Sequence, residues 1–200
     1  MSDVSPDRTI TPIVVPRLTS RDQVVTLAAR GGIGVELGVA EAGLSQKLLG
    51  HQVLSHLFCI DMYAGDRGHD VEQYKRAIAR LLPFRDRSTL IKLRFDEALD
   101  LFPDAFFDFI YVDGYAHTGE EGGQTIADWY PKLKPGGIVA GDDYHPRWPL
   151  VLEAVHAFVA ERGLPLYLID CAEDVPYARY PTWFTAKPSD GPPRDFLAGP

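Results

Sequence analysis

The chain has 200 residues, of which 46% are hydrophobic and 24% are charged, and this is the composition of a globular domain of ordinary size. No apolar run approaches the roughly 18 residues of a membrane-spanning helix, so we expect no membrane partner. The formal net charge of −8 argues against nucleic acid as a partner, because phosphate contacts need a basic face.

The ends of the chain differ in composition from its middle. The first 17 residues contain three prolines, which predicts an extended N-terminal arm rather than part of the domain. Acidic residues and prolines stand where a secretory signal would carry basic and apolar ones, which predicts a cytoplasmic protein. We expect the arm over residues 1–17, one domain over residues 18–188 and a tail over residues 189–200.

The predicted elements begin with a capping-box pattern, Ser20 to Gln23, which indicates a helix that ends at Gly31. Seven short apolar runs then predict strands, at residues 33–37, 56–61, 89–93, 107–113, 138–142, 166–170 and 182–187. Helical patterns separate most of them, at residues 44–49, 70–82, 120–129 and 149–162. This alternation predicts a mainly parallel α/β sheet, and the lack of a helix between the last two runs predicts an antiparallel pair there.

Acidic residues stand at the ends of four predicted strands: Glu36, Asp61, Asp113 and Asp142. In an open α/β sheet, ligands bind outside the carboxyl ends of the strands. We therefore expect these four carboxylates to share one rim and to form the functional site.

A glycine-bearing turn, with Gly38 and Gly43, follows the first of these strands. Glycine permits a tight turn and a close approach of the backbone to a ligand. The spacing is not that of a dinucleotide fingerprint, and the carboxylate of Glu36 just before the turn would repel a phosphate. It suits a cationic ligand such as S-adenosylmethionine (SAM), whose ribose hydroxyls Asp61 is placed to bind.

This order of motifs resembles the class I SAM-dependent methyltransferases. The segment from Glu36 to Gly43 is similar to their first motif, E/D-x-G-x-x-x-G, with one extra residue, and Lys134-Pro-Gly-Gly137 is similar to the turn before their fifth strand. The resemblance implies a Rossmann-like, seven-stranded, mostly parallel sheet in the order 3-2-1-4-5-7-6 with helices on both faces. It also implies that Met62, Arg94, Phe95 and Asp113 contact the cofactor, although many relatives carry an acid where Arg94 stands.

A second group of acids lies at the end of the predicted fourth and fifth strands. Three carboxylates, Asp113, Asp142 and Asp143, offer the oxygen ligands that Mg²⁺ prefers. The pattern resembles the small metal-dependent O-methyltransferases, and the family histidine corresponds to His117. The resemblance implies that Mg²⁺, bound in part by Asp142, activates a hydroxyl of a small molecule and that His117 accepts its proton.

The sequence also leaves three other functions open. One is a methyltransferase that uses no metal, in which the acids after the fifth strand are structural. Another is a metal-dependent hydrolase built on Asp113, Asp142, Asp143 and His145, which would bind metal but not SAM. A third is a module that binds SAM without turnover. A homodimer is an expectation from the family resemblance alone.

Overall fold

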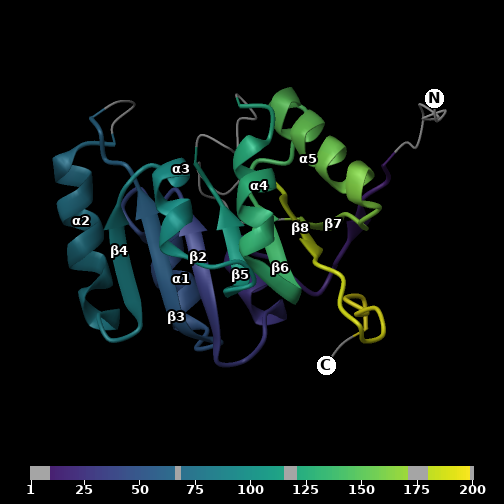
Figure 1. Ribbon diagram of the computed structural model, residues 1–200, viewed down its shortest axis with the longest axis horizontal. Coiled ribbons are helices and arrows are strands. Elements are labelled where there is room, and N and C mark those ends of the chain that lie inside the picture. The colour runs from purple at the N-terminus through teal and green to yellow at the C-terminus, as the bar shows by residue number, and fades with distance from the viewer. Residues whose placement is uncertain (1–9, 66–68, 115–120, 171–179, 199–200) are drawn as a thin grey trace.

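The computed structural model describes residues 10–65, 69–114, 121–170 and 180–198. Its strands form one sheet (Figure 1), and they are β1 (Ile13–Val14), β2 (Gly32–Leu37), β3 (Leu54–Asp61), β4 (Ser88–Lys92), β5 (Phe107–Val112), β6 (Leu133–Gly141), β7 (Tyr167–Ile169) and β8 (Thr182–Ala186). The helices are α1 (Gly43–Gly50), α2 (Val71–Leu81), α3 (Phe95–Ala98), α4 (Gln124–Trp129) and α5 (Pro149–Arg162). Short 3₁₀ helices are η1 (Arg21–Leu27), η2 (Leu82–Phe84), η3 (Leu99–Leu101) and η5 (Tyr130–Lys132).

The strand order confirms the predicted Rossmann-like topology. The sheet runs β1-β7-β8-β6-β5-β2-β3-β4, and without β1 this is the predicted order. The pairs from β4 across to β6 are parallel, whereas β8 is antiparallel to both β6 and β7. The predicted antiparallel pair at the end is therefore confirmed, and every predicted run forms a strand.

The sheet has eight strands rather than the expected seven. The additional strand, β1, is two residues long and lies parallel to β7 within the stretch predicted as an arm. The amides of Ile13 and Val15 donate hydrogen bonds to the carbonyls of Leu166 and Leu168, at 2.9 and 2.8 Å. Its apolar side chains are exposed, so hydrophobic periodicity could not have revealed it.

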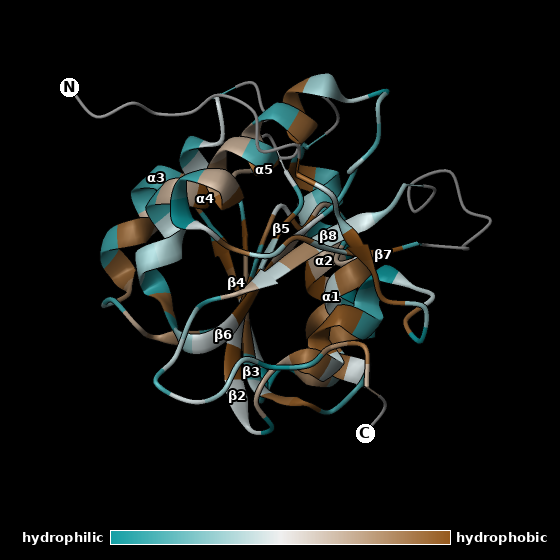
Figure 2. Cartoon of the chain, turned by 90° about the vertical axis from the view of Figure 1, so that its right-hand side faces the viewer, coloured by the Kyte–Doolittle hydropathy of each residue, from teal (hydrophilic) through white to brown (hydrophobic). Residues whose placement is uncertain are grey.

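Helices cover both faces of the sheet (Figure 2). The first core cluster packs η1, α1 and α2 on one face, with Leu48 and Leu57 fully buried. The second packs the helices α4 and α5 on the other face, with Trp129 and Val155 fully buried. Because both faces are covered, the central strands are apolar on both sides, as parallel strands in such folds are.

The helices lie close to their predicted positions. α2 begins where expected, after Asp70. The side chain of Asp70 caps the helix by accepting a hydrogen bond from the amide of Gln73 at 2.8 Å. The capping-box helix is 3₁₀ rather than α, and the Gln23 side chain accepts hydrogen bonds from the amides of Thr19 and Ser20. Within the described ranges, no helix combines the length and the apolar character needed to cross a membrane.

Candidate active site

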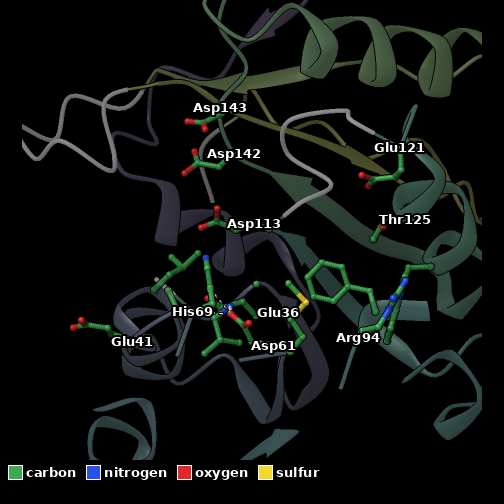
Figure 3. A pocket seen from close by; sticks show the side chains of 18 of the residues that line it. Glu36, Glu41, Asp61, His69, Arg94, Asp113, Glu121, Thr125, Asp142 and Asp143 are labelled. Carbon is green, nitrogen blue, oxygen red and sulfur yellow. Dashed lines mark hydrogen bonds and ion pairs between the residues drawn. The ribbon is translucent and has the colours of Figure 1, made fainter. Parts of the chain in front are cut away.

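The carboxyl ends of the central strands open into one cavity of about 1410 Å³. The four strand-end acids, Glu36, Asp61, Asp113 and Asp142, line this cavity together, as their positions in the sequence predict (Figure 3). The other residues predicted at the cofactor also line it, namely Gly38, Gly43, Met62, Arg94 and Phe95. The cavity therefore unites the two halves of the predicted site.

Gly38 makes the turn after β2 possible. Its φ of +93° lies in the region that glycine adopts without strain, and a Cβ on it would lie 1.5 Å from the carbonyl oxygen of Asp113. The next turn residues, Ala40 and Ala42, also have positive φ, at 47° and 60°. The loop from Gly38 to α1 is therefore tightly bent and presses against the end of β5.

Asp61 braces this loop from the neighbouring strand. Its Oδ2 atom accepts hydrogen bonds from the amides of Val39 and Ala40, both at 2.9 Å, and its Oδ1 atom accepts one from the amide of Tyr63 at 3.3 Å. The Tyr63 hydroxyl donates to the carbonyl of Ala40 at 2.8 Å. The side chain of His69 lies 3.5 Å from the same carboxylate. Asp61 thus fixes the loop backbone as well as facing the cavity.

Glu36 lies at the bottom of the cavity and is 1% exposed. Burial raises the pKa of its carboxyl to about 8, with Asp113 and Asp61 acting in the same direction and Ser45 and Arg21 opposing them. Its Oε2 atom has no hydrogen-bond partner among the described residues. A buried carboxylate in this condition favours a ligand that brings a positive charge.

The end of the cavity predicted to hold adenine is formed by the start of α3. The ring of Phe95 lies so close to Gly114 that a Cβ there would be 2.7 Å from its Cζ. Arg94 is exposed, and its guanidinium bonds with Asp96 at 3.0 Å rather than pointing across the cavity. Phe95 is therefore the apolar surface at this end, and Arg94 lies at its rim.

At the opposite end, Arg21 lies between two of the predicted metal ligands. Its Nη1 atom donates a hydrogen bond to Oδ2 of Asp142 at 2.6 Å and another to Oδ2 of Asp113 at 3.1 Å. The Arg21 side chain is 10% exposed and that of Asp142 is 4% exposed. The second oxygen of Asp142 accepts a hydrogen bond from Thr182 on β8 at 3.3 Å. We call Arg21, Asp113 and Asp142 the Arg21 cluster.

Burial and neighbouring charges shift the pKa values of Arg21 and Asp142. Burial works to lower the pKa of Arg21, but Asp113, Tyr111 and Asp142 outweigh it, so the guanidinium stays charged. Burial raises the pKa of Asp142 to about 7, with Asp113 acting in the same direction and Arg21 opposing. The two shifts therefore have different main causes: neighbouring negative groups raise the pKa of Arg21, and burial raises that of Asp142.

This arrangement does not support the predicted magnesium site. Asp113 and Asp142 are bound to Arg21, so a divalent cation between them would meet a guanidinium at ion-pair distance. Asp143 has a φ of +58° on the turn after β6 and lines the cavity next to them (Figure 3). Across residues 10–65, 69–114, 121–170 and 180–198, no group of three or more His, Cys, Asp or Glu side chains is placed to hold a metal ion. The described residues of the cavity therefore do not fit Mg²⁺.

Two histidines were predicted to take part in catalysis or metal binding, and the structure describes one of them. His117, the predicted proton acceptor, lies outside the described residues. The ring of His145 packs against Tyr180 with centroids 4.7 Å apart, and its Nδ1 atom accepts a hydrogen bond from the amide of Arg147 at 3.2 Å. His145 is thus engaged in the turn before α5, which weakens the reading as a metal-dependent hydrolase.

Sequence reasoning missed several residues of the cavity wall. The side facing the Arg21 cluster is formed by α4 and by aromatic side chains, and it includes Glu121, Gln124, Thr125, Asp128, Trp148 and Tyr180. The polar positions 121, 124, 125 and 128 recur at helical spacing, a signal that could have identified one polar helix face. No sequence pattern marks Arg21 as a site residue, because the capping box from Ser20 to Gln23 already explains the residues around it.

Comparison with known proteins agrees with this fold. Residues 32–144 match the family described as "Methyltransferase domain". The uncharacterized protein y4gI of Sinorhizobium fredii is 27% identical over 118 residues, which are 58% of this chain; the chain spans only 13% of that relative's length.

Two solved structures share the fold. Spermidine synthase from Thermotoga maritima superimposes with a TM-score of 0.61 at 16% identity, over 84% of this chain and 57% of that one. Precorrin-6y C5,15-methyltransferase from Geobacter metallireducens gives a TM-score of 0.60 at 16% identity, over 84% of this chain and 86% of that one. At these identities the likeness concerns the fold alone.

The fold and the cavity define a class I, Rossmann-like α/β protein with a cavity at the carboxyl ends of its strands. Because the family match covers more than half of the chain, the protein belongs to the methyltransferase-domain family. SAM is the cofactor that this family and fold support, as the sequence predicts.

Proposed function

We propose that this protein transfers the methyl group of SAM to a hydroxyl of a small, polar molecule that carries no net negative charge. The observation that carries the proposal is the buried carboxylate of Glu36, unpaired at Oε2, at the bottom of a cavity that continues to the Arg21 cluster. One end of the cavity suits a cationic nucleoside, and the other offers hydrogen-bond acceptors to a hydroxyl.

The cofactor end supports the proposal through three contacts of different chemistry. Glu36 offers a buried negative charge for the ammonium or sulfonium group of SAM. Asp61 lies at the strand end where nucleotide-binding folds place an acid for ribose hydroxyls. Phe95 offers an aromatic face for the adenine. Gly38, which also lines the cavity, lets the cofactor loop turn tightly against the end of β5.

The charge of the cavity supports a neutral acceptor. Its described lining includes nine acidic side chains but only three arginines: Glu36, Glu41, Asp61, Asp96, Asp113, Glu121, Asp128, Asp142 and Asp143 against Arg21, Arg80 and Arg94. Such a lining disfavours phosphorylated acceptors and nucleic acid, because like charges repel in a partly desolvated site. Neutral sugars and phenols remain as the preferred acceptors.

The reaction needs alignment and a proton acceptor. SAM, when bound, supplies a methyl group that passes in line from its sulfur to the acceptor oxygen. The acceptor hydroxyl then donates its hydrogen bond to Asp142 or Asp113, which Arg21 holds in place. We assign acceptance of the proton to His117 or to Asp142. Mg²⁺ is not part of the proposed reaction, because its expected ligands are bound to Arg21.

Isothermal titration of SAM into the wild-type protein tests the proposal. We expect binding, and we expect Glu36→Gln and Asp61→Ala each to weaken it by roughly tenfold or more, the loss of one charge-assisted contact. Asp86→Ala is the matched control, since this acid is 90% exposed and does not line the cavity. Neutral hydroxylated acceptors are then assayed for methylated product. Absence of SAM binding by the folded wild-type protein would refute the proposal.

A further inference from the structure

We propose that Arg21 is the resident cation of the acceptor site: its guanidinium fills the position between Asp113 and Asp142 that a divalent metal would occupy, and it positions both carboxylates for methyl transfer. The catalytic part of this inference rests on the proposed function. The cation-site part does not, and it is tested separately.

The geometry is that of a filled cation site. One nitrogen, Nη1, bridges the oxygens of Asp113 and Asp142, at 3.1 and 2.6 Å. These two oxygens come from the ends of adjacent parallel strands, β5 and β6, so they face the same side of the sheet edge. Hydrogen bonds between ionised groups at such distances are strong and directional. A metal ion in the position of Nη1 would have to displace Arg21.

Arg21 is held in place by the fold rather than by these two contacts alone. Its neighbour Asp22 bonds with His51 at 2.6 Å, which ties η1 to the end of α1. Val24 and Val25, one turn further along η1, are fully buried in the first core cluster. η1 therefore fixes the backbone of Arg21, and the Arg21 side chain is only 10% exposed, which distinguishes it from a surface arginine.

The Arg21 cluster also joins the two ends of the cavity. Asp113 donates its amide hydrogen to the carbonyl of Leu37 at 2.7 Å, and its own carbonyl lies against Gly38. On the other side, Asp142 is fixed by Thr182, whose hydroxyl lies 3.3 Å from that of Tyr111. Arg21 is thus a positioning residue that sets the acceptor-binding carboxylates relative to the cofactor loop.

The first measurement titrates Mn²⁺ into metal-stripped wild-type protein and counts bound ions by electron paramagnetic resonance. Asp142→Asn in the wild-type background serves as the reference for ions bound elsewhere on this acidic protein. We expect wild type and Asp142→Asn to bind the same number of ions. A Mn²⁺ ion bound by wild type and lost in Asp142→Asn would overturn the proposal, and this comparison needs no variant of Arg21.

The second measurement removes the resident cation. We expect Arg21→Met to gain a Mn²⁺ site that the double variant Arg21→Met/Asp142→Asn lacks, whereas the control Arg30→Met, an exposed arginine of the same segment, gains none. A folded Arg21→Met protein that gains no such site would overturn the proposal. If Arg21→Met does not fold by circular dichroism, the comparison of wild type with Asp142→Asn decides.

The third measurement concerns activity with a neutral hydroxylated acceptor. We expect EDTA to leave wild-type turnover unchanged and Arg21→Met to lower kcat by roughly 100-fold, while SAM affinity changes by less than about threefold. Arg21→Lys should restore part of kcat, because an ammonium reaches one carboxylate but cannot bridge two in the same geometry. Loss of wild-type activity in EDTA would contradict the inference. Failure of SAM to bind would instead count against the proposed function and leave the Mn²⁺ result standing.

Discussion

Gly38 and Asp113 approach so closely that the backbone of the cofactor loop and the end of β5 touch without any side chain between them. A Cβ on Gly38 would lie 1.5 Å from the carbonyl oxygen of Asp113, and its φ is +93°. Gly38→Ala should therefore combine backbone strain with a steric clash and lower the free energy of unfolding by at least about 3 kcal/mol. SAM binding should be lost in any protein that still folds.

Gly50→Ala is the matched control for this prediction. A Cβ at Gly50 would meet no atom within 4 Å, and the residue lies at the end of α1. Alanine is the better helix former, so this variant should be as stable as wild type or up to about 1 kcal/mol more stable. Urea unfolding measures both variants. Equal stabilities would show that the loop yields to a side chain at Gly38.

The fold could be predicted because short stretches of the sequence show which residues form each strand and helix. The seven apolar runs follow the period of two or the continuous pattern of buried strands. Among the intervening helices, α2 follows the helical period clearly. The connections then leave few topologies, since parallel crossovers are right-handed. β1 was not predicted because its side chains are exposed and its segment is held by backbone hydrogen bonds to Leu166 and Leu168, before and within β7.

The site could be predicted only in part. Parallel strands place their carboxyl ends at one edge, so the acids at the ends of β2, β3, β5 and β6 had to gather there. Arg21 is separated from Asp113 by 92 residues and from Asp142 by 121 residues. No sequence pattern links residues so far apart, and the capping box already accounted for the Arg21 segment. In the sequence, Asp142 and Asp143 after β6 therefore resemble metal ligands, although in the structure Arg21 binds Asp142.

Glu36 should make the stability of the ligand-free protein depend on pH. Burial raises the pKa of its carboxyl from 4.5 to about 8, so the folded state holds this proton over a range where the unfolded chain has released it. The stabilisation is fully present below the unfolded pKa and is lost as the pH rises towards 8. Wild type should lose on the order of 3 kcal/mol relative to Glu36→Gln between about pH 5.5 and pH 8.

Unfolding in urea at both pH values measures this difference, with Glu153→Gln as the control. Glu153 is an exposed acid on α5 that does not line the cavity, so its replacement should leave the wild-type slope unchanged. The prediction fails if Glu36→Gln follows the same pH dependence as wild type.

The affinity for SAM should pass through a maximum near pH 8. Below that pH, Glu36 must release a proton before it can pair with the ammonium group, and above it the amino group of SAM, with a pKa of roughly 8, begins to lose its own proton. Each limb should change the dissociation constant by up to about tenfold per pH unit. Glu36→Gln should remove the acidic limb, because no proton has to leave, and should weaken the alkaline limb, because the charge that favours the ammonium is gone. Calorimetric titrations across the range measure the profile, and an unchanged acidic limb in the variant would exclude Glu36 as the partner of the ammonium.

Phe95 should contribute to binding through the adenine alone. Its ring lines the cavity beside Gly114 and is only partly buried in the absence of ligand, so it offers an apolar surface that a bound base would cover. Phe95→Ala should weaken SAM and S-adenosylhomocysteine equally, by about tenfold, because both carry the same adenosine. Phe84→Ala removes a similarly half-buried ring that lies outside the cavity, and it should lower stability without changing either affinity. If Phe95→Ala weakened SAM but not S-adenosylhomocysteine, the ring would instead act on the methyl-bearing sulfonium, and the adenine would have to bind elsewhere along the cavity.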